Sequence, residues 1–148
     1  MELSKIAKIT QVFLYFLLVI GGISLFFVRG FVRLMHIPNQ NEYTFIIILI
    51  GLCCLYIVFE VIKVFQSISS GNPFISSNEK SLKKIACICE FITLILIIAL
   101  FLFITTTTYI LASIILIFVF GIAGLCCYVF SQLFKLSVFL KEENDMTI

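Results

Sequence analysis

Four polar side chains stand out because each lies in or beside a long apolar segment: Gln11, Glu60, Glu90 and Gln132. Carboxylate and amide groups in such a setting can bind a cation, carry a proton or hydrogen-bond a partner peptide. Lys63 follows Glu60 by three residues, on the same helical face, and is a local partner for that acid. Helical rise places all four groups near one end of their segments, so we expect a single polar layer.

The same layer also has a purely structural interpretation, in which it joins neighbouring helices. Polar side chains hydrogen-bond between helices in membranes, and long ones extend towards the interface. A carboxylate at mid-bilayer costs about 2.5–3.5 kcal/mol on insertion scales, so both acids should face the bundle interior or water. Glu90 has no basic partner close by in sequence and is the strongest candidate for a functional acid. Both interpretations stay open at this point.

The elements that must position these groups are four apolar segments. The 148-residue chain is 62% hydrophobic, whereas soluble domains are about 45–50% apolar. A membrane-spanning helix needs roughly 20 apolar residues, and four such segments cover about 9–28, 44–64, 85–104 and 109–131. Open strands are excluded because their edge amides would stay unpaired in lipid. The predicted fold is all-α, an integral membrane four-helix bundle forming one domain of residues 1–148.

The basic residues predict that both termini are cytoplasmic, because cytoplasmic segments of membrane proteins are rich in Lys and Arg. With the N-terminus inside, all eight lysines lie on the cytoplasmic side and both arginines lie outside. The lysines are Lys5, Lys8, Lys63, Lys80, Lys83, Lys84, Lys135 and Lys141, and the arginines are Arg29 and Arg33. This orientation predicts one cytoplasmic loop, 65–84, and a cytoplasmic tail, 132–148.

Two pairs of similar segments indicate that the chain consists of two tandem helical hairpins. The pairs are "GLCCLY" at 51–56 with "GLCCY" at 124–128, and "KIAKITQ" at 5–11 with "KIACICE" at 84–90. The alignment matches Gln11 with Glu90 and Glu60 with Gln132. Each hairpin would begin and end inside, so an axis along the membrane normal would relate the halves, as in some transporters.

No pattern for catalysis, a cofactor or direct nucleic-acid binding is found. The net charge of +2 is small, and the chain has no basic patch interleaved with aromatic residues. His36 is the single histidine, and there is no Ser/His/Asp set or Gly-rich phosphate loop. The six cysteines lie within the apolar segments at spacings that point their thiols apart, so we interpret them as packing residues. We expect no enzymatic activity, no cofactor and no metal.

The loop and the tail are the sizeable cytoplasmic surfaces that this topology predicts. Gly71, Asn72 and Pro73 are typical of a turn, and Phe74 is expected at the interface. The tail continues the fourth helix and carries apolar residues beyond the span, Leu133, Phe134, Leu136, Phe139 and Leu140. Apolar residues in this position are suited to docking a cytosolic protein. The loop also has a simpler interpretation, as the turn that leads into the third helix.

The element formed by Gly71, Asn72, Pro73 and Phe74, with "LKKIA" after it, resembles a bacterial family of four-span proteins. This family is named domain of unknown function 2975, and in it a G-x-P-F element links the second and third spans. The resemblance covers nearly the whole chain and implies no established activity. Members are often encoded beside a small helix-turn-helix regulator, which implies a cytosolic regulator as partner and a location in the bacterial inner membrane.

We therefore expect a non-enzymatic multi-pass membrane protein that binds a cytosolic regulator of the helix-turn-helix type through the loop and the tail. One alternative is a small transporter or ion-conducting subunit that uses the Glu and Gln layer. Another is an immunity-type protein that counters a membrane-active peptide through the outer segment 29–43. The lipid bilayer is an expected partner in all three cases, and self-association into a homo-oligomer is left open.

Overall fold

The computed structural model describes residues 2–34, 39–71, 75–102 and 107–146, and nearly all of these are helical. The helices are α1 (Glu2–Leu34), α2 (Gln40–Ser69), α3 (Ser76–Leu102) and α4 (Thr107–Met146). By length and composition all four are able to cross a membrane. The predicted fold class, an all-α bundle of four long apolar helices, is confirmed over the part of the chain that the structure describes.

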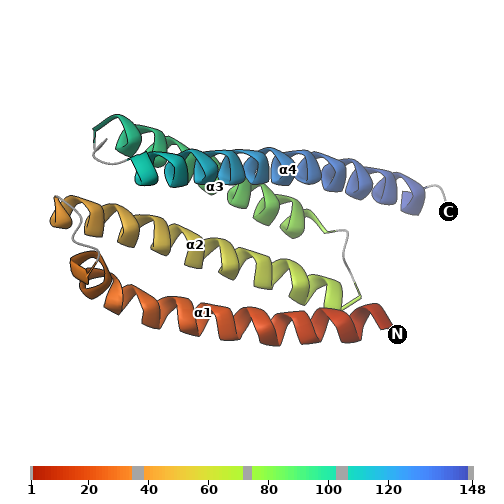
Figure 1. The fold of residues 1–148 in the computed structure, drawn as a ribbon. Helices are drawn as coiled ribbons and strands as arrows, with labels where there is room; N and C mark the ends of the chain where they lie inside the picture. Colours follow the sequence, from red (N-terminus) through yellow and green to blue (C-terminus); the bar gives the residue numbers. More distant parts are fainter. Residues whose placement is uncertain (1, 35–38, 72–74, 103–106, 147–148) are drawn as a thin grey trace.

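The helices form two antiparallel hairpins, α1 with α2 and α3 with α4, which meet where α2 packs on α3 (Figure 1). Within the described ranges, close backbone contact joins only helices that follow one another in the chain. The start of α1, the end of α2, the start of α3 and the end of α4 all lie at the same end of the bundle (Figure 1). The two tandem hairpins expected from the sequence are thus present.

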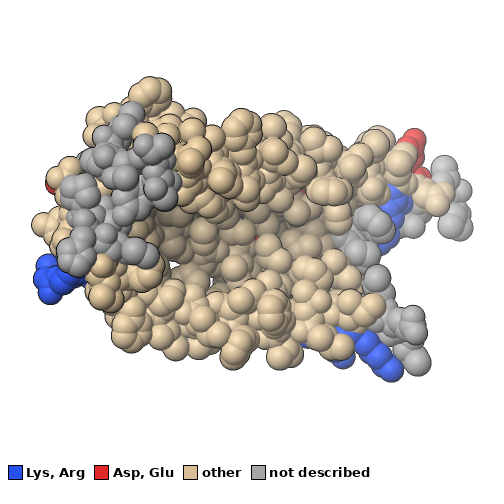
Figure 2. Space-filling view, in the orientation of Figure 1, with Lys and Arg blue, Asp and Glu red and all other residues tan. Residues whose placement is uncertain are grey.

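Most charged side chains gather at the two ends of the molecule, and the two acids Glu60 and Glu90 are exceptions. On the face drawn in Figure 2, Lys and Arg lie at opposite ends, and the long middle section is covered by uncharged residues. Large apolar side chains are exposed along this middle section, among them Phe26 and Phe118 at 87% and 66%. An apolar belt bounded by charge is the surface that a lipid bilayer requires.

α3 contributes more buried side chains than any other described helix, because it packs against both α2 and α4. Its buried apolar residues recur every three or four positions: Ile85, Cys89, Ile92 and Leu96. This spacing places them on one helical face. Asn78 and Ser81 continue the same face towards the start of α3, and both are buried. The core of the molecule is therefore apolar in its middle and polar at one end.

Two glycines allow close packing in the first hairpin, because a leucine from the facing helix packs against each of them. A Cβ atom added at Gly21 would lie 2.8 Å from Leu55 Cδ2, and one added at Gly51 would overlap Leu25 Cδ2. Small residues allow helix backbones to approach closely in membranes, where dispersion contacts drive association. These reciprocal contacts set the axial position of α1 against α2.

The connection between α2 and α3 is much shorter than the predicted loop 65–84, since α2 continues to Ser69 and α3 begins at Ser76. The tail from 132 is likewise helical as far as Met146. Polar residues mark where a helix leaves hydrocarbon and do not end the helix. α2 ends instead where Gly71 adopts φ +84°, a left-handed conformation that glycine favours. Residues 72–74 of the predicted turn lie outside the described residues.

The alignment of the two halves does not extend to their contacts. Gly51 and Gly124 match in that alignment, and so do Gln11 and Glu90. Gly124 packs against Glu90, so an equivalent first hairpin would place Gly51 against Gln11. Gly51 packs against Leu25 instead, which lies 14 residues, or about 21 Å, further along α1. Short apolar matches therefore do not make the two hairpins equivalent in register.

We predict that Gly51→Leu lowers the free energy of unfolding by about 1–3 kcal/mol, because the new side chain displaces Leu25 from the α1–α2 contact. Gly22→Leu is the matched control, since no atom lies within 4 Å of a Cβ atom added there. The control should change stability by about 0.5 kcal/mol or less. Denaturation in detergent, followed by circular dichroism, measures both, and equal losses would contradict the assigned contact.

Candidate functional site

The carboxylate of Glu60 is fully buried and has several polar partners. Lys63 Nζ donates a hydrogen bond to Oε1 over 2.9 Å, and Ser81 Oγ donates one to Oε2 over 2.7 Å. Lys84 Nζ approaches Oε1 at 3.4 Å from α3. The predicted pair of Glu60 with Lys63 is therefore present, and two partners from another helix join it. Both carboxylate oxygens are satisfied within the bundle.

The two lysines of this cluster lie at its outer edge, whereas the acid lies inside. The side chains of Lys63 and Lys84 are 41% and 53% exposed, against 0% for Glu60. The Lys63 ammonium also lies 4.4 Å from the centroid of the Phe59 ring, a cation–π contact. The cluster thus joins α2 to α3 with one buried negative charge and two flanking positive charges.

Two further hydrogen bonds extend this contact across the end of the bundle. Asn78 Nδ2 donates to Ser67 Oγ over 3.0 Å, which links α3 to α2. Ser131 Oγ, fully buried on α4, donates to the backbone oxygen of Glu79 over 3.2 Å. Each contact satisfies a polar group that burial would otherwise leave without water. α2, α3 and α4 are therefore joined by hydrogen bonds at one end of the molecule.

Glu90 does not belong to this cluster. It lies nine residues along α3 from Ser81, about 13 Å in axial distance. Its carboxylate lies against α4 instead, where a Cβ atom added at Gly124 would be 2.6 Å from Oε1. The prediction of one layer containing both acids is wrong, because the register of α2 and α3 brings Glu60 to the start of α3. Glu90 consequently lies nearer the mid-length of the bundle, where the residue is exposed, so Glu60 and not Glu90 faces the bundle interior.

The two glutamines of the predicted layer also lie apart from Glu60. Gln11 is on α1, which makes no close backbone contact with α3 or α4 in the described residues. Its amide nitrogen is buried and has no hydrogen-bond partner among them. Gln132 is exposed on α4, beside Lys135 and Phe139 in a shallow pocket. Of the five residues predicted for the layer, the structure brings together Glu60 and Lys63.

Sequence reasoning did not select Ser81, Asn78 or Ser131. A signal for the first two was present, because Asn78 and Ser81 continue the apolar stripe of α3 at helical spacing. A polar residue on such a stripe must find a partner on the helix it faces. Ser131 has no comparable local signal, since its partner is a backbone oxygen 52 residues away in sequence.

The geometry of the Glu60 cluster favours a structural role over ion transfer. A carboxylate with both oxygens occupied and no exposed surface offers no coordination site for an incoming cation. Within the described residues no three His, Cys, Asp or Glu side chains lie close enough to hold a metal ion. The arrangement is that of interhelical hydrogen bonding, in which removal of both cations would leave a buried charge uncompensated.

Comparison with known proteins gives a match over nearly the whole chain. The family described as "Protein of unknown function (DUF2975)" has a model that matches residues 6–148. No curated protein and no solved structure matches the chain. The architecture and the contacts described above are therefore the main guide to function.

We predict that Lys63 and Lys84 substitute for each other as partners of Glu60. Lys63→Gln or Lys84→Gln alone should cost about 1 kcal/mol or less, because one lysine still neutralises the acid. The double variant should cost about 3 kcal/mol, since it leaves a buried charge without an ionic partner. A double-mutant cycle of unfolding in detergent measures the coupling. Strictly additive losses of unfolding free energy would contradict the idea that the two lysines share the neutralisation of Glu60. Lys80→Gln serves as the control.

We also predict that Gly124→Ala weakens the α3–α4 contact by about 1–3 kcal/mol. The new methyl group would lie 3.2 Å from Cys89 Cβ and 2.6 Å from the Glu90 carboxylate. Gly121→Ala is the matched control one turn earlier, where the nearest atom is 4.0 Å away. Adding Glu90→Ala to Gly124→Ala should restore part of the loss. Unfolding in detergent measures all three variants, and a loss at Gly121 as large as at Gly124 would refute the assignment.

Proposed function

We propose that this chain, which belongs to the DUF2975 family, is a non-enzymatic membrane protein that docks a cytosolic regulator on the projecting end of α4. The membership that the G-x-P-F element indicated is thereby established, but the family's description assigns no activity. The four helices, which by length and composition are able to cross a membrane, support a multi-span membrane protein. The docking function rests on the geometry of the last part of α4.

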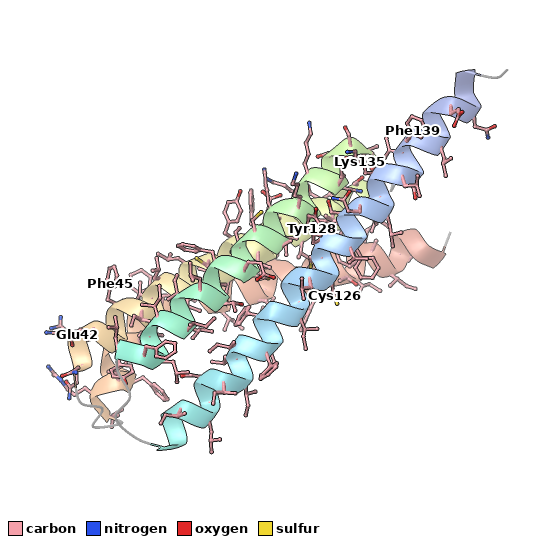
Figure 3. All side chains as sticks on the ribbon, turned by 90° about the horizontal axis from the view of Figure 1, so that it is seen from above. Glu42, Phe45, Cys126, Tyr128, Lys135 and Phe139 are labelled. Carbon is pink, nitrogen blue, oxygen red and sulfur yellow. The ribbon has the colours of Figure 1, made fainter. Side chains whose placement is uncertain are left out.

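The observation that carries this proposal is the length of α4. Its 40 residues make a helix of about 60 Å, twice the roughly 30 Å of hydrocarbon in a bilayer. Ser131 contacts the backbone of Glu79, close to the start of α3. The residues after Ser131 continue to Met146 for about 22 Å. Figures 1 and 3 show this end of α4, including Phe139, extending past the start of α3.

The projecting segment presents an apolar stripe. Leu133, Leu136 and Leu140 follow one another at spacings of three and four, and each is more than half exposed. Phe139 beside them is 61% exposed. Anchors at i, i+3 and i+7 are the pattern by which a helix binds in the groove of a partner. Phe134, the other predicted contact residue, lies off this stripe and is less exposed than the stripe residues, because it is partly buried.

The distribution of charge supports a cytoplasmic location for the projecting end. Lys135 and Lys141 lie on it, whereas both arginines lie in α1 beyond its apolar segment. Lysine enrichment on one side favours the orientation with both termini inside, in a bacterial inner membrane. Gly71 is exposed at the same end. Asn72, Pro73 and Phe74 stay predicted contacts. The partner that the family resemblance favours is a small helix-turn-helix protein, which would supply the DNA contacts that this chain is not expected to make.

The transporter alternative has weaker support. It would need Glu60 and Glu90 to act on one path, but Glu60 bonds to Ser81 and Glu90 lies about 13 Å further along α3 from that serine. Glu60 is also occupied by Lys63 and Ser81. The immunity alternative, which would act through the segment 29–43, draws support from none of the described contacts.

Photocrosslinking in cells from a probe at position 136 tests the docking function. We expect a discrete adduct with a soluble protein of the helix-turn-helix type, because Leu136 is the centre of the exposed stripe. A probe at Leu125, which is 63% exposed on the same helix within the apolar section, is the matched control and should label lipid. A probe at position 74 tests the loop in parallel. Adducts from position 136 that contain only lipid or this chain would overturn the proposal.

A further inference from the structure

A groove of about 760 Å³ runs between α2 and α3 on the outside of the bundle. Its apolar wall includes Cys53 and Tyr56 from α2 and Cys87 from α3. Three lysines from the first turns of α3 complete the lining, Lys80, Lys83 and Lys84. The volume lies in the range of about 300–1,000 Å³ that is common for small-molecule sites. The groove is separate from the docking stripe of α4.

Charge and apolar surface are segregated along the groove. Lys84 meets Glu60 at 3.4 Å, and from that point the antiparallel helices run side by side towards the middle of the bundle. Continuing along α3, the lining changes from Lys84 to Cys87, and on α2 it consists of Tyr56 and Cys53, which lie further towards the middle than the buried Glu60. The cationic end therefore lies at the end of the apolar belt, and the apolar end lies inside the belt. The groove thus matches an amphiphilic anion, which has a charged headgroup at one end and an apolar chain at the other.

The cationic end carries excess positive charge. Among the residues that the structure describes, the lining of the groove includes three lysines and no carboxylate. Lys84 shares the buried Glu60 with Lys63. Lys80 and Lys83 are exposed, and neither has an ion-pair partner in the part of the chain that the structure describes. Two ammonium groups are thus available to an anion that enters from the membrane surface.

The geometry points to a binding site for an anionic phospholipid in this groove. The phosphate and the headgroup would lie against Lys80 and Lys83, and an acyl chain would lie along Tyr56, Cys53 and Cys87. A soluble anion would use the cationic end but leave the apolar wall uncovered, and a neutral lipid would do the reverse. The inference is independent of the partner on α4, although it rests on the placement of the bundle in a membrane.

Two native thiols provide a test within one molecule. Cys87 lies in the groove wall, whereas Cys126 is exposed on α4 (Figure 3). The full chain in neutral detergent would be titrated with phosphatidylglycerol or with phosphatidylcholine of the same acyl chains. Peptide mass spectrometry would then follow maleimide labelling of each thiol. We expect phosphatidylglycerol to slow labelling of Cys87 at concentrations where phosphatidylcholine does not, and the two lipids to affect Cys126 alike.

Two double variants distinguish binding in the groove from a non-specific attraction between lysines and anionic lipid. Lys80→Gln with Lys83→Gln should raise the phosphatidylglycerol concentration needed for protection by on the order of tenfold. Lys135→Gln with Lys141→Gln removes the same charge from α4 and should leave protection unchanged. Equal protection by both lipids, equal protection of both thiols, or equal effects of the two variants would overturn the proposal. Protection by glycerol phosphate alone would also overturn it, in favour of a soluble anion.

Discussion

The arrangement of the bundle depends on the buried carboxylate of Glu60 at the contact between α2 and α3. In the described residues these are the helices through which one hairpin touches the other. A carboxylate away from water is costly unless it is paired and hydrogen-bonded. α3 must therefore bring Ser81 and Lys84 to it, which sets both the axial position and the rotation of α3 against α2.

The extension of α4 past the start of α3 follows from the axial position of α3 against α2. Because Ser81 and Lys84 lie near the start of α3, the Glu60 contact places this start well inside the end of the bundle. Ser131 then meets the first turn of α3, and the rest of α4 has no α3 beside it. The same placement brings Lys80 and Lys83 to the mouth of the groove. The projecting stripe and the cationic groove thus have a common origin in the α2–α3 contact.

Hydropathy was sufficient to predict four long helices, since lipid requires that every backbone amide be paired within a helix, and the repeated segments indicated their arrangement in two hairpins. Helical spacing was sufficient to predict the pair of Glu60 with Lys63, because residues three apart lie on the same helical face. The positions of Glu90, Gln11 and Gln132 depend on the register between helices, which hydropathy does not contain. Gly51 and Gly124 lie in similar segments but have different partners, because the size and polarity of the facing side chain decide where each glycine packs.

The groove and the docking stripe lie at the same end of the bundle, but different interactions determine what each of them binds. The stripe around Leu136 and Phe139 lies on a segment that extends about 22 Å beyond Ser131. Charges at the surface are screened over about 8 Å at physiological ionic strength. The lysines of the groove therefore contribute little to the field at the far end of the stripe. Recognition there has to come from apolar contact and shape, whereas the groove distinguishes its ligands by charge.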